Sequence, residues 1–226
     1  MVITLGTEID EVTLQRVRTC ATALEGARIP GVTDVVPANA TIGVFYNVNL
    51  LGHDVSPSER VRRWITDTIS LDVLQRTAGK AVDSMGQRAR AVEIPVCYGG
   101  SHGPDLDHVA AHTGLSRHEV VALHSGVIYE VSAVGFTPGF PYLSGLPKKL
   151  QTPRRPTPRF NVAAGSIGIG GALTGIYPVN SPGGWQIIGR TPLVLFDPRR
   201  EAAATLRVGD RVSFKAVSEE DFSKWN

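Results

Sequence analysis

The sequence predicts an α+β protein in which a small N-terminal α/β sandwich domain (residues 1–90) precedes an all-β domain, a barrel or a sandwich (residues 91–226). Its 226 residues are 42% hydrophobic and 19% charged, which is typical of a globular chain with one or two domains. Its 24 glycines and 15 prolines are concentrated after residue 90, and such residues mark the turns between short strands. Helical and strand-like patterns alternate before residue 90, whereas strand-like runs dominate after residue 127.

The N-terminal domain is expected to hold two helices on a mainly antiparallel sheet. The first helix covers residues 9–25, with Asp10 as its candidate N-cap. The second begins at a capping-box pattern of Ser56 and Glu59, with Pro57 at the first helical position. Their apolar stripes are Val17, Cys20, Ala21 and Leu24, and Val61, Trp64, Ile65 and Ile69. The predicted strands of this layer are residues 1–5, 32–36, 41–47 and 91–97.

A pair of short helices is expected over residues 104–124. Gly114 is placed to end the first helix, and Ser116 with Glu119 forms a second capping box. The pair is similar in length to a helix-turn-helix, but its second helix is mostly apolar, so we expect it to pack on the β domain and not to read DNA. The strands predicted after it are the runs IYEVSAVGF, GSIGIGG, GWQIIG, PLVLFD and DRVSFKAV.

Charge, cysteine count and hydropathy exclude several classes of protein. A net charge of +2 gives no electrostatic basis for binding nucleic acid or an anionic membrane. The two cysteines form neither a disulfide framework nor a zinc-ligand spacing, and His108 and His112 lack further ligands, so no metal site is expected. The sequence has no apolar run of the roughly 18 residues that span a bilayer and no signal-peptide pattern, which predicts a cytoplasmic protein.

The glycine-rich run at residues 165–171 has two interpretations. It lacks the Lys-Ser/Thr ending of a phosphate loop and the third glycine of a dinucleotide-binding fingerprint. Its glycines either form tight turns of the β domain or let backbone N–H groups, such as those of Gly165 and Ser166, line an anion site.

Three further segments rich in glycine and proline are candidates for one binding site. Residues 135–147 and 177–185 display aromatic side chains on rigid, irregular backbone, as binding loops do. Residues 152–159 (TPRRPTPR) hold arginines between prolines; these form either a solvated surface or a site for carboxylate or phosphate. The candidate binding residues are Phe136, Pro138, Gly139, Phe140, Tyr142, Gly165, Ser166, Tyr177, Asn180, Ser181, Gly183, Trp185 and Arg190.

His124 ends the second helix of the pair, directly before the first strand of the β domain. An imidazole at this position either caps helix carbonyls or forms a hydrogen bond in the core. The alternative is a role in acid–base chemistry or in binding substrate at a cleft.

Five motifs follow one another along the chain: GFTPGFPYLSGLP, TPRRPTPR, AAGSIGIGG, TGIYPVNSPGGWQIIGRTP and LFDP. Through these motifs the chain closely resembles the bacterial family of allophanate hydrolase subunit 1. This family is also known as KipI-like or as the B subunit of 5-oxoprolinase (PxpB). The resemblance covers residues 92–214 and implies a C-terminal cyclophilin-like β-barrel. It also implies a partner, the homologous allophanate hydrolase subunit 2, which is the C subunit of 5-oxoprolinase. In the 5-oxoprolinase complex, these two work with a third protein, the A subunit, to open the lactam of 5-oxoproline to glutamate with ATP hydrolysis.

The resemblance implies roles for residues within these motifs. Arg154, Arg159 and Arg190 would stabilise anionic groups, the first two as catalytic residues, and His124 would be the catalytic acid–base group. ATP would be shared with the complex, since the chain lacks a phosphate loop, and no metal is expected. The alternatives are a KipI-type inhibitor that binds a histidine kinase and a carboxyltransferase-like subunit acting on urea or allophanate.

Overall fold

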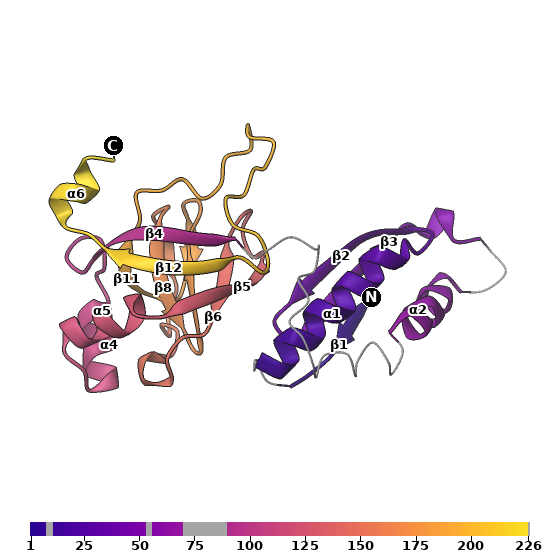
Figure 1. Cartoon of the computed structure of the whole chain (residues 1–226), viewed down its shortest axis with the longest axis horizontal. Coiled ribbons are helices and arrows are strands. Elements are labelled where there is room, and N and C mark those ends of the chain that lie inside the picture. The colour runs from indigo at the N-terminus through magenta and orange to yellow at the C-terminus, as the bar shows by residue number, and fades with distance from the viewer. Residues whose placement is uncertain (8–10, 53–55, 70–89, 226) are drawn as a thin grey trace. The chain divides into compact units, whose positions relative to one another are not determined.

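The structure is a computed structural model that describes residues 1–7, 11–52, 56–69 and 90–225 (Figure 1). The chain divides into two compact units, Met1–Arg88 and Ala89–Asn226, which are described separately. Asp10, the predicted N-cap, lies outside the described residues. Within the described ranges, none of the helices has the length and apolar character that crossing a membrane requires.

The first unit contains a three-stranded antiparallel sheet in the order β1-β3-β2. The long helix α1 packs against β2 and β3 (Figure 1). The elements of this unit are β1 (Val2–Thr4), α1 (Glu11–Ala27), β2 (Val32–Ala38), β3 (Thr41–Tyr46), the 3-10 turn η1 (Val48–Leu50) and α2 (Pro57–Thr68).

The core of this unit consists largely of the predicted helix stripes. All four apolar residues predicted for the first stripe are buried, as are Val61 and Ile65 of α2. The capping box predicted at Ser56 is wrong, because its side chain accepts no hydrogen bond from the helix. The Ser56 hydroxyl instead lies 2.9 Å from that of Ser58, and the Glu59 carboxylate lies 3.9 Å from Arg62 on the same helix.

The second unit is a closed barrel in the order β11-β4-β12-β5-β6-β9-β8, with β8 pairing back to β11. Every pair is antiparallel except β4 with β12, which are parallel. A separate two-stranded sheet pairs β7 with β10. The strands are β4 (Ala91–Tyr98), β5 (Ile128–Val134), β6 (Pro141–Ser144), β7 (Arg159–Val162), β8 (Ser166–Gly170), β9 (Leu173–Ile176), β10 (Ser181–Gly183), β11 (Gln186–Arg190) and β12 (Arg211–Ala216).

Two strand predictions need correction. The sequence places β4 in the N-terminal layer, but its Ile94 and Val96 are buried in the barrel core and it pairs with β11 and β12. The run PLVLFD is not a strand and forms only an isolated bridge between Phe196 and Ala204. Its apolar character reflects Leu195, whose side chain is buried in the same core.

The predicted helix pair packs on the barrel. α4 (Leu106–Thr113) lies against β11, and α5 (Arg117–Ser125) lies against β12 (Figure 1). α4 ends at Gly114, which has a left-handed φ of 69°. The capping box of Ser116 and Glu119 is confirmed, since both of its hydrogen bonds form. A 3-10 turn, η3 (Lys148–Leu150), and a terminal helix, α6 (Glu219–Ser223), complete the unit.

Candidate functional site

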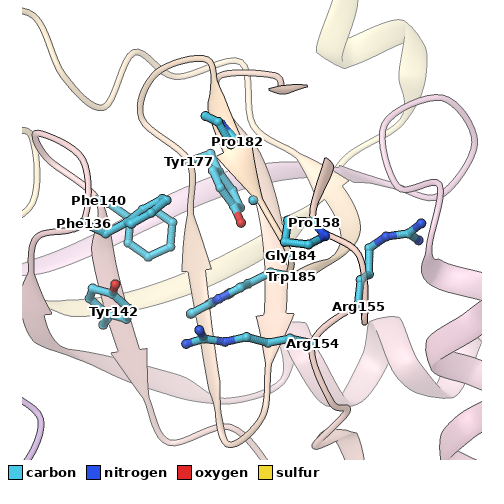
Figure 2. A pocket seen from close by; sticks show the side chains of 11 residues that line it. Phe136, Phe140, Tyr142, Arg154, Arg155, Pro158, Tyr177, Pro182, Gly184 and Trp185 are labelled. Carbon is cyan, nitrogen blue, oxygen red and sulfur yellow. The ribbon is translucent and has the colours of Figure 1, made fainter. Parts of the chain in front are cut away.

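A cavity of about 330 Å³ opens where the three predicted loops of the barrel unit meet (Figure 2). The loop between β5 and β6 supplies one wall, and the segment before β7 supplies the second. The third wall follows β9 and runs through β10 to the start of β11. The lining residues are Phe136, Phe140, Tyr142, Arg154, Arg155, Pro158, Tyr177, Pro182, Gly183, Gly184 and Trp185.

Phe140 is the centre of the aromatic wall. Its ring centroid lies 4.9 Å from that of Tyr142, 5.2 Å from Tyr177 and 5.4 Å from Trp185, at edge-to-face or tilted angles. Only 1% of Phe140 is exposed. Edge-to-face aromatic contacts of this kind fix ring orientation, so the wall is rigid and apolar.

The glycine-rich run supports this wall and does not form a phosphate loop. Residues 166–170 form β8, whose backbone pairs with β9 and β11, so its N–H groups are not left to cradle an anion. A Cβ atom at Gly170 would lie 2.6 Å from the Trp185 ring, and one at Gly175, on the neighbouring strand β9, would lie 2.9 Å from the Phe140 ring. Glycine at these positions lets the pocket aromatics approach the barrel backbone.

Phe136 lies at the rim of the pocket in a strained conformation. Its φ of 70° is unusual for a residue with a Cβ atom, and its side chain is 64% exposed. Backbone hydrogen bonds hold the turn: the N–H of Gly135 donates to the Phe140 carbonyl oxygen (3.0 Å), and that of Phe140 donates to Thr137 (3.0 Å). Strain that is held in this way is common at binding sites.

Arg154 supplies the positive charge of the pocket. Its guanidinium carbon lies 5.7 Å from the centroid of the Trp185 ring, a cation–π contact. Burial raises the pKa of Tyr142 and of Tyr177, so both phenols are neutral at physiological pH and can donate hydrogen bonds. The pocket thus combines apolar rings, two neutral hydroxyls and two guanidiniums, of which that of Arg155 is paired with Asp105.

Asp105 forms ion pairs with two arginines of residues 154–159, which we call the arginine segment. Asp105 was not among the residues predicted for the site. Its side chain is 5% exposed, and its Oδ1 accepts hydrogen bonds from Arg155 Nη1 (3.1 Å) and Arg159 Nη2 (2.7 Å). Oδ2 accepts the backbone N–H of Ile187 at 2.6 Å. The sequence held one signal for it: residues 152–165 contain three arginines and no acidic residue, so any carboxylate that pairs with these arginines must lie elsewhere in the chain.

His124 lies in the barrel interior and not in the pocket. It is wholly buried, with Nδ1 2.8 Å from the Tyr98 hydroxyl and Nε2 3.0 Å from the Thr174 hydroxyl. Because Thr174 donates its proton to the Gly168 carbonyl oxygen, Nε2 carries the imidazole proton and Nδ1 accepts from Tyr98. Burial lowers the pKa of His124 to about 3. The acid–base role of His124 stays a prediction.

Other predicted site residues form the frame behind the pocket. Arg190 donates to the Ala164 carbonyl oxygen at 2.8 Å, and the Asn180 side chain accepts the Ala164 N–H at 2.8 Å. The Gly165 N–H donates to the Tyr177 carbonyl oxygen. The predicted residues that do not line the pocket are His124, Pro138, Gly139, Arg159, Gly165, Ser166, Asn180, Ser181 and Arg190. The lining residues outside the predicted set are Arg155, Pro158, Pro182 and Gly184, all of which belong to the predicted loops.

No group of three His, Cys, Asp or Glu side chains that could hold a metal ion occurs in the described part of the chain. His108 and His112 of α4 lie with ring centroids 6.4 Å apart and roughly parallel planes.

The chain is similar to proteins of known name. The family model for the carboxyltransferase domain, subdomains C and D, matches residues 1–206. The B subunit of 5-oxoprolinase from Bacillus subtilis (strain 168) is 43% identical over 98% of this chain and 91% of its own length. That of Escherichia coli O157:H7 is 48% identical over 82% of this chain and 78% of its own length. The urea amidolyase of Saccharomyces cerevisiae is 33% identical over 53% of this chain and 7% of its own length.

Among solved structures, TTHA0988 superposes with a TM-score of 0.75 at 37% identity and covers 96% of this chain. The chain spans only 40% of the length of TTHA0988.

Proposed function

This chain belongs to the family of carboxyltransferase domains, subdomains C and D, and from that premise we propose that it is the B subunit of a heteromeric, ATP-dependent 5-oxoprolinase. The complex opens the lactam ring of 5-oxoproline to give glutamate. Its other members are the homologous C subunit and a third protein, the A subunit. The names of the relatives from B. subtilis and E. coli, which are subunits of a 5-oxoprolinase, support this proposal.

The observation that carries the proposal is the pairing of Arg154 with an aromatic wall in one small pocket. The substrate is a flat five-membered ring that bears one carboxylate and one amide oxygen. The apolar aromatic wall suits the ring, and the Arg154 guanidinium suits the carboxylate. The neutral hydroxyls of Tyr142 and Tyr177 are donors suited to the amide oxygen.

We place ATP on another member of the complex. ATP supplies the free energy that activates the lactam. Among the described residues that line the pocket, Arg154 offers a guanidinium that is not paired with a carboxylate, and none belongs to a glycine-rich turn at the start of a helix. Such a pocket is a poor fit to a triphosphate. The chain's own contribution is therefore to bind and orient the lactam.

Two exposed aromatic side chains support a partner protein. Phe160 on β7 is 97% exposed and Phe136 at the pocket rim is 64% exposed. Aromatic side chains are enriched at protein–protein interfaces, so these two rings are candidates for contact with a partner. We also propose that the barrel is of the cyclophilin-like class, that residues 1–90 form an α/β sandwich, and that the protein is cytoplasmic.

Reconstitution of the three subunits tests the proposal. We expect 5-oxoproline and ATP to yield glutamate only when this chain is present. Arg154→Ala should lower kcat/KM about 10- to 100-fold, since a hydrogen bond to a charged group contributes about 1.5–3 kcal/mol. The matched control is Arg117→Ala, which removes an exposed arginine that pairs with Asp107 on the helix pair. A full reconstituted set that forms no glutamate from 5-oxoproline would refute the function.

A second candidate is a carboxyltransferase-like subunit acting on urea or a related amide. The description of the matching family and the similarity to a urea amidolyase favour it. Turnover of urea, together with a biotin carboxylase, in place of 5-oxoproline would distinguish it.

A further inference from the structure

The arginine segment, residues 154–159, is attached to the rest of the barrel unit through its backbone and its side chains, and its last residue, Arg159, pairs with Gly183 of β10 as the first residue of β7. Prolines at 153, 156 and 158 restrict its backbone. The N–H of Arg155 donates to the Gly184 carbonyl oxygen at 2.7 Å. The ion pairs of Arg155 and Arg159 with Asp105 attach its side chains.

Asp105 is itself rigidly held. It stands directly before α4, and its backbone N–H donates to the Ile187 carbonyl oxygen at 2.8 Å while its Oδ2 accepts the Ile187 N–H at 2.6 Å. This pair of bonds fixes the carboxylate on β11, next to the pocket residue Trp185. The position suggests a helix N-cap, but the side chain makes no capping hydrogen bond. Its acceptor atoms serve the arginine segment and β11 instead.

Arg154 and Arg155 point in opposite directions. Figure 2 shows the Arg154 guanidinium reaching along Trp185 toward Tyr142, while the Arg155 guanidinium points away from the aromatic wall. Arg155 precedes Pro156, which favours extended backbone at Arg155, and neighbouring side chains on extended backbone point to opposite sides. A bond that holds the Arg155 side chain away from the aromatic wall should therefore keep the Arg154 side chain on the side of the wall.

We propose that Asp105 is a positioning residue, which clamps Arg155 and Arg159 so that Arg154 is held over Trp185 in the substrate pocket. The effect on catalysis rests on the proposed function, whereas the effect on the pocket does not. A buried ion pair is weak evidence for stability but serves well to specify one geometry.

The first test measures turnover of the reconstituted complex with Asp105→Asn, which keeps the shape of the side chain and removes its charge. We expect kcat/KM for 5-oxoproline to fall about 10-fold and by no more than in Arg154→Ala, because displacing a binding group cannot cost more than removing it. Asp107→Asn is the matched control: Asp107 lies on α4, its side chain is 65% exposed, and it pairs with Arg117 at the surface. This control should stay within about twofold of the original chain.

A double-mutant cycle separates positioning from general damage. If Asp105 acts through Arg154, Asp105→Asn should add less than about a twofold loss in an Arg154→Ala background. If the loss of kcat/KM in the double variant equals the product of the two single losses, the two residues act independently and the proposal is overturned.

Fluorescence tests the same point without catalysis. In a Trp64→Phe, Trp225→Phe background, Trp185 is the remaining tryptophan. Asp105→Asn should increase acrylamide quenching of Trp185, which is 5% exposed, because Arg154 no longer covers it. Arg155→Gln cuts the clamp from the other side, leaves Asp105 paired with Arg159, and should give the same change if Asp105→Asn fails to fold. Unchanged quenching in the folded variants would overturn the proposal that Asp105 positions Arg154. If quenching changes but the complex does not use 5-oxoproline, the proposed function alone is refuted.

Discussion

The barrel interior and the pocket face of the same unit differ in how completely their polar atoms are paired. In the interior, both nitrogens of His124 form hydrogen bonds, the Thr174 hydroxyl donates a hydrogen bond to the Gly168 carbonyl oxygen, and the Tyr129 hydroxyl donates to the His124 carbonyl oxygen. On the pocket side of the unit, three buried atoms have no partner among the described residues: Nε of Arg155, which lines the pocket, and Nη1 of Arg159 and Oγ of Ser181, which adjoin the lining residues Pro158 and Pro182 along the chain.

This difference separates polar groups that stabilise the fold from polar groups that are available to bind a ligand or a partner. A closed network needs no ligand, so His124 and its neighbours specify how the barrel packs. Each unpaired buried donor costs about 1–3 kcal/mol, and a bound ligand or partner that pairs it recovers that free energy. Residues that bind are therefore expected where pairing is incomplete.

The largest expected effect is on the interior. His124→Ala should lower the free energy of unfolding by about 3–5 kcal/mol, because it leaves a cavity and strips the Tyr98 and Thr174 hydroxyls of a partner. Urea unfolding of the isolated chain measures this loss. If turnover of the complex were lost while the free energy of unfolding stayed constant, the acid–base role predicted for His124 would be supported. The assignment of the interior network to packing alone would then be wrong.

The next effect is the pH dependence of the same network. The pKa of His124 is about 3 in the folded chain against an ordinary value of 6.5, so only the unfolded chain takes up a proton between these values. Stability from the neutral imidazole is complete above pH 6.5 and is lost as the pH falls toward 3, by about 1.4 kcal/mol per unit. Urea unfolding should show the stability advantage over His124→Ala shrinking by about 2 kcal/mol between pH 6.5 and 5. A constant difference would show that the imidazole takes up a proton as readily in the folded chain as in the unfolded chain, which contradicts a lowered pKa.

The smallest effect concerns strain at the pocket face. Phe136→Gly should be about 1 kcal/mol more stable to urea than Phe136→Ala, because glycine alone adopts a φ of 70° without steric cost. At Phe160, in strand β7, the same pair of substitutions should have the opposite order, since glycine weakens a strand. Equal stabilities at position 136 would mean that the turn relaxes.

Local patterns predicted much of the fold. The stripe of α1 and the cap at Ser116 depend on neighbours within a few residues, which periodicity and capping rules capture. Ser56 shows the limit of such rules, because the same motif forms without its bonds. The short strands β6, β7, β9 and β10 were not predicted, since three or four residues are too few to show a period, and all but β7 also contain Gly or Pro.

The site was predicted at the level of loops but not of contacts. Gly and Pro marked the segments that surround the pocket, because rigid irregular backbone needs them. The sequence could not assign Asp105 to Arg155 and Arg159, which lie 50 and 54 residues away, or separate Arg154, which faces the pocket, from Arg159, which does not line it. Those distinctions depend on tertiary packing, which no spacing in the chain records.

The parallel pairing of β4 with β12 sets the order in which the barrel unit can be completed. β12 is the last strand of the barrel, and it inserts between β4, the first strand, and β5. A growing chain that has not yet released residues 211–216 from the ribosome therefore carries two unpaired strand edges. All the loops that line the pocket are synthesised before β12. The barrel that supports these loops is nevertheless completed only when β12 pairs, although β12 contributes no residue to the pocket lining. Removing that strand should leave a chain that aggregates during synthesis.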